Sequence, residues 1–315
     1  MHPAYSIIVF TVASGAGYGV LFALALIAVF ATPPGDIWFG LCGFGLALAL
    51  VSVGLASSAL HLGHPERALK AFSQWRSSWL SREGVAAAAS YPVAGIFALV
   101  WLLGGSGVLL VVPALATAAT CIVTVACTGM IYASLKPVRR WHNGWVVPGY
   151  LALALMTGAL WLGALAHLFG VARPEFAWFG AAAVVVAGLL KLGYWRFIDH
   201  DTGGPTAESA TGLGALGEVR LLDAPHTSEN YLLKEMGYSI ARKYARRLRR
   251  EALWWGFLLP LPSAFAAGLL APASFATFCA LLAAALASAG VLVERWLFFA
   301  EARHSVTLYY GARTA

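Results

Sequence analysis

The segment SIIVFTVASGAGYGVLFALALIAVFA, residues 6–31, contains no charged side chain. A helix needs about 20 mostly apolar residues to cross the hydrocarbon core of a bilayer, and this segment is long enough to do so. It is too long and too uniformly apolar for a strand of a membrane barrel. We do not expect a signal peptide, because no basic region precedes the segment and its apolar run is too long. The segment therefore predicts a transmembrane helix.

Further segments of this kind follow, and Pro- or Gly-containing breaks such as Thr32–Asp36 and Gly104–Gly107 separate several of them. The predicted spans are Ser6–Ala31, Ile37–Leu60, Gly84–Leu103, Val108–Ser134, Trp145–Leu168, Phe176–Phe197, Leu253–Leu270 and Ser274–Phe299. The composition agrees, since 60% of the 315 residues are hydrophobic and 11% are charged, whereas a soluble domain has about 25% charged residues. We predict an all-α, polytopic membrane protein with eight transmembrane helices.

The basic residues divide unequally between the two ends of the predicted helices. Of the 21 Lys and Arg residues, only Arg173 falls in the four short breaks; the others belong to the termini, to the loops after spans two, four and six, or to the adjoining helix ends. Cytoplasmic loops of membrane proteins carry an excess of Lys and Arg. We therefore predict that both termini and the large loops are cytoplasmic.

The chain is expected to have three parts. Residues 1–198 form a six-helix transmembrane part that includes a candidate site loop at 61–83, residues 199–251 form a cytoplasmic loop and helix, and residues 252–315 form helices seven and eight with a C-terminal tail. In residues 228–250, apolar residues recur at helical spacing among many Lys and Arg residues. This pattern predicts a basic amphipathic cytoplasmic helix before helix seven, lying on anionic lipid. Docking of a partner subunit is a compatible alternative, whereas nucleic-acid binding is not expected.

Other residues of the spans have predicted structural roles. Lys191, about two turns inside span six, is expected to extend to the cytoplasmic surface, and lining a cavity is the alternative. Trp141 and Trp145 are expected in the interfacial aromatic belt. Pro260 and Pro262 are expected to kink span seven.

The cysteines are expected to be buried thiols, because all of them lie inside apolar spans and no C-x-x-C motif occurs. Iron–sulfur clusters need runs of cysteine ligands. We therefore expect no such cluster, and no other metal site, in this chain.

Ionisable residues gather where span two ends. The stretch SSALHLGHPERALKAF, residues 57–72, contains His61, His64 and Arg67, and SSWLSREG, residues 77–84, brings Glu83 to the start of span three. Histidine exchanges protons near neutral pH, and ionisable groups at membrane depth are functional candidates. An acid, a base and an arginine beside an apolar, aromatic wall suit an amphipathic, proton-exchanging ring such as a quinone.

Alternatives remain open for these residues. Glu83 could be a helix-start residue that the helix dipole stabilises, and His61 could be an interfacial histidine without a function. A haem held by two histidines is not expected. His61 and His167 end their spans on opposite sides of a hydrocarbon core about 30 Å thick, and helix spacing does not support a pairing with His142 or His200.

The motifs LHLGHPERA, residues 60–68, and SSWLSRE, residues 77–83, resemble the DmsC family, the membrane anchor subunits of dimethyl-sulfoxide-reductase-type molybdoenzymes. The segment TSENYLLKEMGYSIARKYARRLR, residues 227–249, is similar to the branch that serves membrane-bound sulfite dehydrogenases. The resemblance implies three subunits: a molybdopterin catalytic subunit, an iron–sulfur subunit, and an anchor that binds quinone.

The resemblance also implies site residues. His61, Arg67 and Glu83 match the family's quinone-site histidine, arginine and glutamate and are the predicted catalytic residues. The predicted quinone-binding residues are Ser57, His61, His64, Arg67, Trp79 and Glu83. His61 would hydrogen-bond a quinone carbonyl and donate a proton, Arg67 would stabilise negative charge, and Glu83 would orient the histidine or relay protons.

We therefore predict the anchor and quinone-reactive subunit of a molybdenum/iron–sulfur oxidoreductase in a bacterial inner membrane. It would pass electrons from sulfite oxidation to ubiquinone or menaquinone. The alternatives are an anchor without quinone chemistry, an anchor for a dimethyl-sulfoxide-type reductase that oxidises quinol, and a secondary transporter. Transporters usually show inverted repeats and helices broken at the midplane, and neither is found in this sequence.

Overall fold

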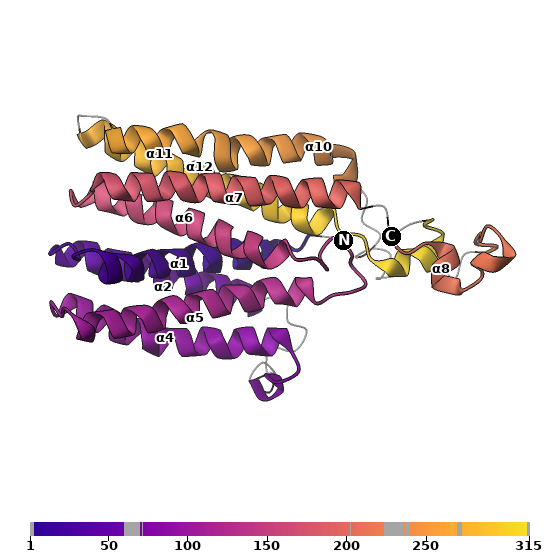
Figure 1. The fold of residues 1–315 in the computed structure, drawn as a ribbon, viewed down its shortest axis with the longest axis horizontal. Coiled ribbons are helices and arrows are strands. Elements are labelled where there is room, and N and C mark those ends of the chain that lie inside the picture. The colour runs from indigo at the N-terminus through magenta and orange to yellow at the C-terminus, as the bar shows by residue number, and fades with distance from the viewer. Residues whose placement is uncertain are drawn as a thin grey trace.

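The computed structural model describes residues 3–59, 70, 72–201, 203–223, 236, 240–269 and 273–313. Within these residues the chain is helical and contains no β-strand. The α-helices are α1 (Tyr5–Phe30), α2 (Ile37–Ala59), α4 (Trp79–Leu102), α5 (Val108–Ala133), α6 (Val146–Leu168), α7 (Pro174–His200), α8 (Ala207–Thr211), α10 (Ile240–Leu253), α11 (Pro260–Leu269) and α12 (Ala273–Ala300). Figure 1 shows the long helices side by side in one bundle.

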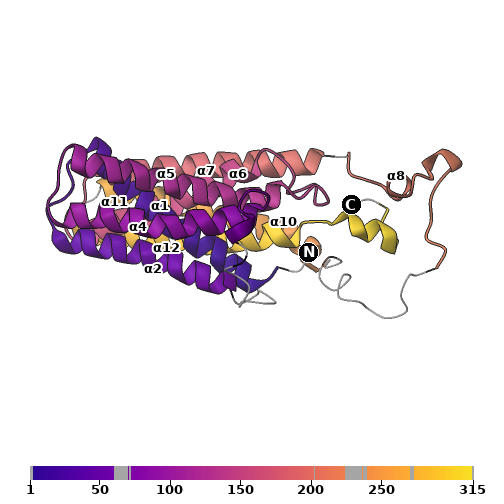
Figure 2. The ribbon, with the colours of Figure 1, turned by 90° about the horizontal axis from the view of Figure 1, so that it is seen from below.

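In the described part of the chain, 8 helical segments are long and apolar enough to cross a membrane. They are α1, α2, α4, α5, α6, α7, the continuous segment Tyr244–Leu269, and α12. The predicted all-α fold with eight transmembrane helices is therefore confirmed. Figure 2 shows α8 and the C-terminal segment extending beyond the helix ends, on the side where the N-terminus lies.

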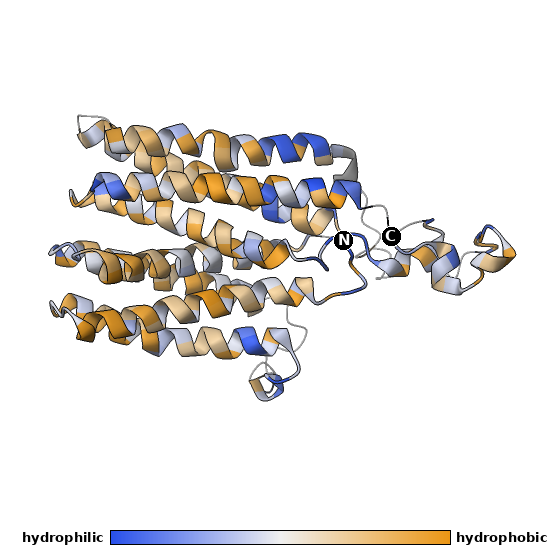
Figure 3. Cartoon of the chain, in the orientation of Figure 1, coloured by the Kyte–Doolittle hydropathy of each residue, from blue (hydrophilic) through white to orange (hydrophobic). Residues whose placement is uncertain are grey.

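The two ends of the bundle differ in polarity. One end, called here the basic end, holds the start of α1, the end of α2, the start of α4 and α8. The opposite end, called here the short-loop end, holds the turns between α1 and α2, between α4 and α5, and between α6 and α7. Figure 3 shows hydrophobic residues along the helices and hydrophilic residues concentrated toward the basic end of α4, α7 and α10.

Helices α1 and α6 form the centre of the bundle. Helix α1 packs against α2, α5, α6 and α12, and α6 also packs against α5, α7 and α12. The two central helices approach most closely at Gly19 and Gly158, where a Cβ on either residue would overlap the backbone of the other helix. Small residues allow such contacts between membrane helices. These glycines therefore permit the approach that brings the buried faces of α5, α6 and α12 around α1.

Span seven changes helix type just before its first proline. A π-helical turn, η4 (Trp254–Leu258), connects α10 to α11, and the Leu259 amide donates to the Trp254 carbonyl at 3.0 Å. Pro260 has no amide hydrogen and its ring would crowd the carbonyl four residues before it in a regular α-helix. The irregularity predicted at the prolines therefore takes the form of a widened turn directly before Pro260.

The predicted amphipathic helix is described only in part. Residues 224–235 and 237–239 lie outside the described residues, and α10 begins at Ile240. From there the helix continues into span seven. Its position on a lipid surface stays a prediction.

Other predicted details are corrected. Helix α4 begins at Trp79, before the predicted Gly84, because the Ser78 hydroxyl accepts a hydrogen bond from the Ser81 amide and caps the helix. Cys42 is exposed on α2, whereas Cys121, Cys127 and Cys279 are buried. The expectation of buried thiols is therefore wrong for Cys42.

Candidate functional site

The predicted site residues fall into two groups. His61, His64 and Arg67 lie outside the residues that the structure describes, and their roles stay predictions. Ser57, Trp79 and Glu83 are described. These three residues lie near the end of α2 and the start of α4, both at the basic end of the bundle (Figure 1).

Glu83 is buried inside the bundle. It is the fifth residue of α4, its exposed fraction is 4%, and its carboxylate accepts a hydrogen bond from the Thr128 hydroxyl of α5. The alternative of a helix-start residue is wrong, because α4 begins at Trp79 and Glu83 lies beyond the first turn. A carboxyl group among membrane helices is expensive to bury without a partner. Helices α4 and α5 thus provide that partner across their interface.

Arg82 fixes the loop that precedes α4. Its guanidinium donates to the Trp75 carbonyl at 2.9 Å and to the Arg76 carbonyl at 2.6 Å. It also lies over the Trp79 ring, 4.2 Å from the ring centroid. The loop 72–78 is therefore fastened to the first turn of α4, next to Glu83. The sequence analysis assigned Arg82 no role.

Ser57 has a structural contact. Its hydroxyl donates to the Ser6 carbonyl at 2.9 Å and joins the end of α2 to the start of α1. Trp79 is partly buried beneath Arg82. The roles of Ser57 and Trp79 in quinone binding stay predictions.

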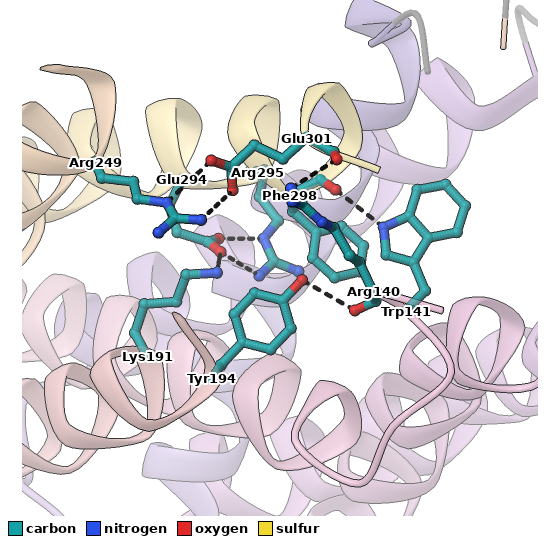
Figure 4. A network of polar contacts seen from close by, with 9 residues as sticks. All are labelled: Arg140, Trp141, Lys191, Tyr194, Arg249, Glu294, Arg295, Phe298 and Glu301. Carbon is teal, nitrogen blue, oxygen red and sulfur yellow. Dashed lines mark hydrogen bonds and ion pairs between the residues drawn. The ribbon is translucent and has the colours of Figure 1, made fainter. Parts of the chain in front are cut away.

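A second buried cluster lies where α7 and α12 meet, and we call Lys191, Glu294 and Arg295 the charged triad. Lys191 Nζ forms an ion pair with Glu294, and Arg295 donates to the two Glu294 carboxylate oxygens at 2.5 and 2.8 Å (Figure 4). Their exposed fractions are 6%, 0% and 4%. The expected extension of Lys191 to the surface is therefore wrong. Because Glu294 sits on α12, Lys191 satisfies its charge by pairing inside the bundle.

A second set of polar contacts lies where α12 ends, about two helical turns beyond Glu294. Arg249 donates to both Glu301 carboxylate oxygens, at 3.0 and 3.2 Å, and to Asp199 at 2.7 Å. Arg140 donates to the Glu301 carbonyl at 2.9 Å (Figure 4). These contacts join α7, α10 and the loop after α5 to the end of α12.

The loop after α5 also buries an aromatic residue. The Trp141 indole donates to the Phe298 carbonyl at 2.9 Å, and Trp141 is 3% exposed. The predicted belt position of Trp141 is therefore wrong. The ring packs on α12, where its N–H has a protein partner. Trp145, at the start of α6, is partly buried and packs against the hydrophobic core to which Trp141 belongs.

Two apolar cavities open between the helices. The larger, about 580 Å³, lies at the short-loop end between α1, α6 and α7, and Phe30, Arg173 and Phe176 line it. The smaller, about 370 Å³, lies between α1, α5 and α6, and Tyr18 and Val125 are among its lining residues. Both volumes fall within the range of small-molecule sites. Val125 of the smaller cavity lies on α5, the helix that carries Thr128, but neither Thr128 nor Glu83 is among the residues that line this cavity.

Most of the site residues that could not be predicted are hydrogen-bond or ion-pair partners of predicted residues. They do not belong to the two motifs near the end of span two. Thr128, the hydrogen-bond partner of Glu83, gave no signal in its own segment, since hydroxyl residues are common in membrane helices. Glu294 and Arg295 did give one, because adjacent charges deep in an apolar span mark a candidate functional site. The sequence analysis counted Arg295 only among the basic residues at helix ends.

Comparison with known proteins agrees with this architecture. Residues 1–216 match the family model for the DMSO reductase anchor subunit (DmsC). The chain is 31% identical to the C subunit of the sulfite dehydrogenase of Allochromatium vinosum over 330 residues, which covers 98% of this chain and 99% of that protein. It is 30% identical to the C subunit of the anaerobic dimethyl sulfoxide reductase of Escherichia coli over 156 residues, covering 48% of this chain and 54% of that protein. The predicted resemblance is confirmed, and this multi-pass membrane protein belongs to the DMSO reductase anchor subunit family.

Proposed function

We propose that this protein is the membrane anchor of a molybdenum/iron–sulfur oxidoreductase and that it exchanges electrons and protons with quinone. The catalytic and iron–sulfur subunits are separate chains in this proposal, and the catalytic subunit oxidises sulfite. Support for the anchor role comes from the family membership. Support for sulfite comes from the similarity to a sulfite dehydrogenase subunit along 98% of the chain.

The burial of Glu83 is the observation that carries the quinone proposal. A carboxyl group with a neutral hydroxyl partner sits 4% exposed at the basic end of the bundle, and in the sequence it follows the motif that contains His61 and Arg67. A quinone, when bound, supplies two-electron chemistry coupled to two protons. The bundle can hold such a group, because the 370 Å³ apolar cavity between α1, α5 and α6 has room for a hydrophobic ring or tail.

Each side chain has a distinct task in this proposal. Glu83 holds or releases a proton at its carboxyl oxygen, and Thr128 fixes the orientation of that carboxyl. His61 hydrogen-bonds a carbonyl of the bound ring and serves as its proton donor. Arg67 stabilises negative charge as it develops. Ser57, His64 and Trp79 complete the proposed wall of the site.

We propose that the basic end faces the cytoplasm of a bacterium, within the inner membrane, and docks the partner subunits. Among the described Lys and Arg residues, only Arg173 lies at the short-loop end. The positive-inside rule then places the other end in the cytoplasm. The proposed docking surface includes α8 and the C-terminal segment, which extend beyond the helix ends on that side (Figure 2), and the loop before α4 at the same end of the bundle.

Substitution of Glu83 tests the proposal in the assembled complex. Glu83→Gln keeps the shape and can still accept a hydrogen bond from Thr128, but it cannot exchange a proton. We expect quinone-linked sulfite oxidation to fall by about 10²-fold or more, the usual contribution of a general acid or base. Oxidation of sulfite with a soluble dye should stay unchanged, because that electron path bypasses the anchor.

The matched control is Glu175→Gln, since Glu175 is an exposed carboxylate at the short-loop end of α7. It should leave both activities intact. His61→Ala should reproduce the loss seen for Glu83→Gln. Unchanged quinone-linked turnover in both site variants, with the partner subunits' metals present in full amount, would contradict the proposed site.

A second candidate has the same site working in reverse. The similarity to a dimethyl sulfoxide reductase subunit over 48% of this chain favours an anchor that oxidises quinol for a reductase. The purified complex distinguishes the two by its substrate. Reduction of an S-oxide with quinol, together with no oxidation of sulfite, would favour the reductase.

A further inference from the structure

A small polar cavity lies inside the bundle between α1, α5, α6 and α12. Its volume is about 20 Å³, counted as the space open to the centre of a water molecule. One buried water needs roughly 10–15 Å³ by this measure. The polar residues that line the cavity are Thr11, Ser14, Thr128, Tyr150, Thr157 and Arg295, and all of them are buried. The cavity is therefore large enough for one water molecule and is lined by groups that can bind it.

Two of these groups make no hydrogen bond of normal length and angle within the described part of the chain, although they lie close enough to interact with each other. They are the Tyr150 hydroxyl and Nη1 of Arg295, whose residues are 6% and 4% exposed. The guanidinium carbon lies 4.2 Å from the centroid of the Tyr150 ring, so the two side chains are stacked together beside the cavity. Buried polar atoms without partners are rare in native proteins, and a bound water or ion commonly satisfies them.

The remaining lining groups offer oxygen lone pairs rather than hydrogens. Thr11, Ser14 and Thr157 donate their hydroxyl hydrogens to carbonyls of their own helices, at 3.0, 2.6 and 2.9 Å. Thr128 donates to Glu83 or to the Thr124 carbonyl. A water molecule can accept from Arg295 and Tyr150 and donate to these hydroxyl oxygens. A halide ion would find few donors there and several acceptors.

Thr128 belongs to two sites at once. It holds the Glu83 carboxylate on one side and lines the cavity on the other, where Arg295 begins the charged triad. The triad contains two cations and one anion, so it has a net positive charge. A bound ligand in the cavity would thus complete a hydrogen-bonded connection from Glu83 to Lys191.

We propose that the cavity binds one water molecule and that this water joins Glu83–Thr128 to Arg295–Glu294–Lys191 in a single hydrogen-bonded chain. Tyr150 and Arg295 are then positioning residues, because they hold the water that fixes Thr128 and, through it, the Glu83 carboxyl. This last step rests on the proposed quinone function. The water site itself does not.

A density map of the whole complex, fine enough to show ordered waters, tests the site directly. We expect a peak within about 3.2 Å of Arg295 Nη1 and of the Tyr150 hydroxyl. An empty cavity, or one closed by side chains, would overturn the proposal. So would an anomalous bromide peak at this position in crystals grown with bromide, because that result identifies an anion.

Tyr150→Phe tests the link to Glu83. It removes one donor to the water and keeps the ring that stacks on Arg295. We expect quinone-linked kcat to fall severalfold, with the KM for quinone and the dye-linked oxidation unchanged. The control is Tyr132→Phe: the Tyr132 ring stacks on Tyr150 at 5.8 Å between centroids but does not line the cavity. It should leave kcat unchanged.

The two tests separate the proposals. Suppose that Tyr150→Phe keeps its full kcat while Glu83→Gln is inactive with quinone. That result would show that the water has no part in quinone turnover, and it would leave the proposed function intact. Full quinone activity in Glu83→Gln would remove the proposed function, whereas the density peak would still decide on the water. If Tyr150→Phe fails to assemble, the map of the unchanged complex decides the proposal.

Discussion

The bundle buries two glutamates in different ways. Glu83, between α4 and α5, has a neutral hydroxyl as its hydrogen-bond partner among the described residues. Glu294, between α7 and α12, is held by Lys191 and Arg295. Two cations strongly favour the ionised carboxylate, while a hydroxyl can serve either the ionised or the neutral form. The difference suits Glu83 to proton exchange and Glu294 to holding the helices together.

The two glutamates also differ in the segments and side chains that surround them. A loop fastened by Arg82 covers the start of α4. The Glu294 side is enclosed by α10, by the loop after α5 and by the aromatic rings of Tyr194 and Phe298, which contact the cations of the triad. The described loop 72–78 therefore lies beside the buried Glu83, whereas helices and aromatic rings surround the charged triad.

The largest expected effect on stability comes from Glu294→Gln. It leaves two buried cations without a counter-charge, and breaking a buried ion pair typically costs about 3–5 kcal/mol. Glu83→Gln should cost about 1 kcal/mol or less, since a neutral hydrogen bond replaces a charge-assisted one. Thermal unfolding of the assembled complex in detergent measures both. Equal losses of stability in Glu294→Gln and Glu83→Gln would contradict the inference that Glu294, unlike Glu83, holds the helices together.

Lys191→Met sharpens the comparison with a smaller expected loss. It leaves Glu294 paired with Arg295 alone, so the buried charges balance. We expect a loss of about 1–2 kcal/mol, well below that of Glu294→Gln, because no unpaired ion remains. Thermal unfolding under the same conditions shows whether Lys191→Met loses less stability than Glu294→Gln. A greater loss for Lys191→Met would show that the net positive charge of the triad is needed for stability.

The helices were predictable because each span has to satisfy one local condition, about 20 apolar residues in a row. The unequal distribution of basic residues was likewise predictable, because it follows from a count of the Lys and Arg residues in each loop. The start of α4 was placed wrongly because the prediction did not take the capping signal of Ser78 into account. That signal was present in the sequence.

The pairs inside the bundle could not be predicted in the same way. Lys191 and Glu294 are more than 100 positions apart in the sequence, and their contact depends on which faces of α7 and α12 meet. Without that knowledge, a lysine near a helix end is expected to reach the surface. Trp141 shows the same limit, since an interfacial and a buried tryptophan have the same sequence pattern. His61 and Arg67 lie outside the described residues, so their place at the site stays a prediction.

Arg82→Ala tests the loop on the Glu83 side. It removes two hydrogen bonds to backbone carbonyls and the contact with Trp79. We expect the KM for quinone to rise severalfold with little change in kcat, because the loop is loosened while Glu83 keeps Thr128. The matched control is Arg76→Ala, which keeps the carbonyl that Arg82 uses and removes only a side chain whose guanidinium lies 5.5 Å from the exposed Trp75 ring. A loss of kcat equal to that of Glu83→Gln would show that Arg82 acts in the chemistry.

The smallest expected effect comes from Asp201, just after α7, in a loop outside the membrane. Arg139 donates to its carboxylate at 2.5 and 2.6 Å, and this hydrogen bonding lowers the pKa of Asp201 below its usual range. A lowered pKa in the folded state gives stability that is present above the unfolded pKa of about 3.9 and is lost as the pH falls through the folded pKa. The pair is partly exposed at the surface, so Asp201→Asn should cost at most about 1 kcal/mol at neutral pH. Thermal unfolding at pH 7 and at pH 3 measures this, and the difference between variant and parent should shrink at the lower pH and at high salt. A constant difference would mean that Asp201 acts through its shape rather than its charge, unlike Glu294 in the bundle.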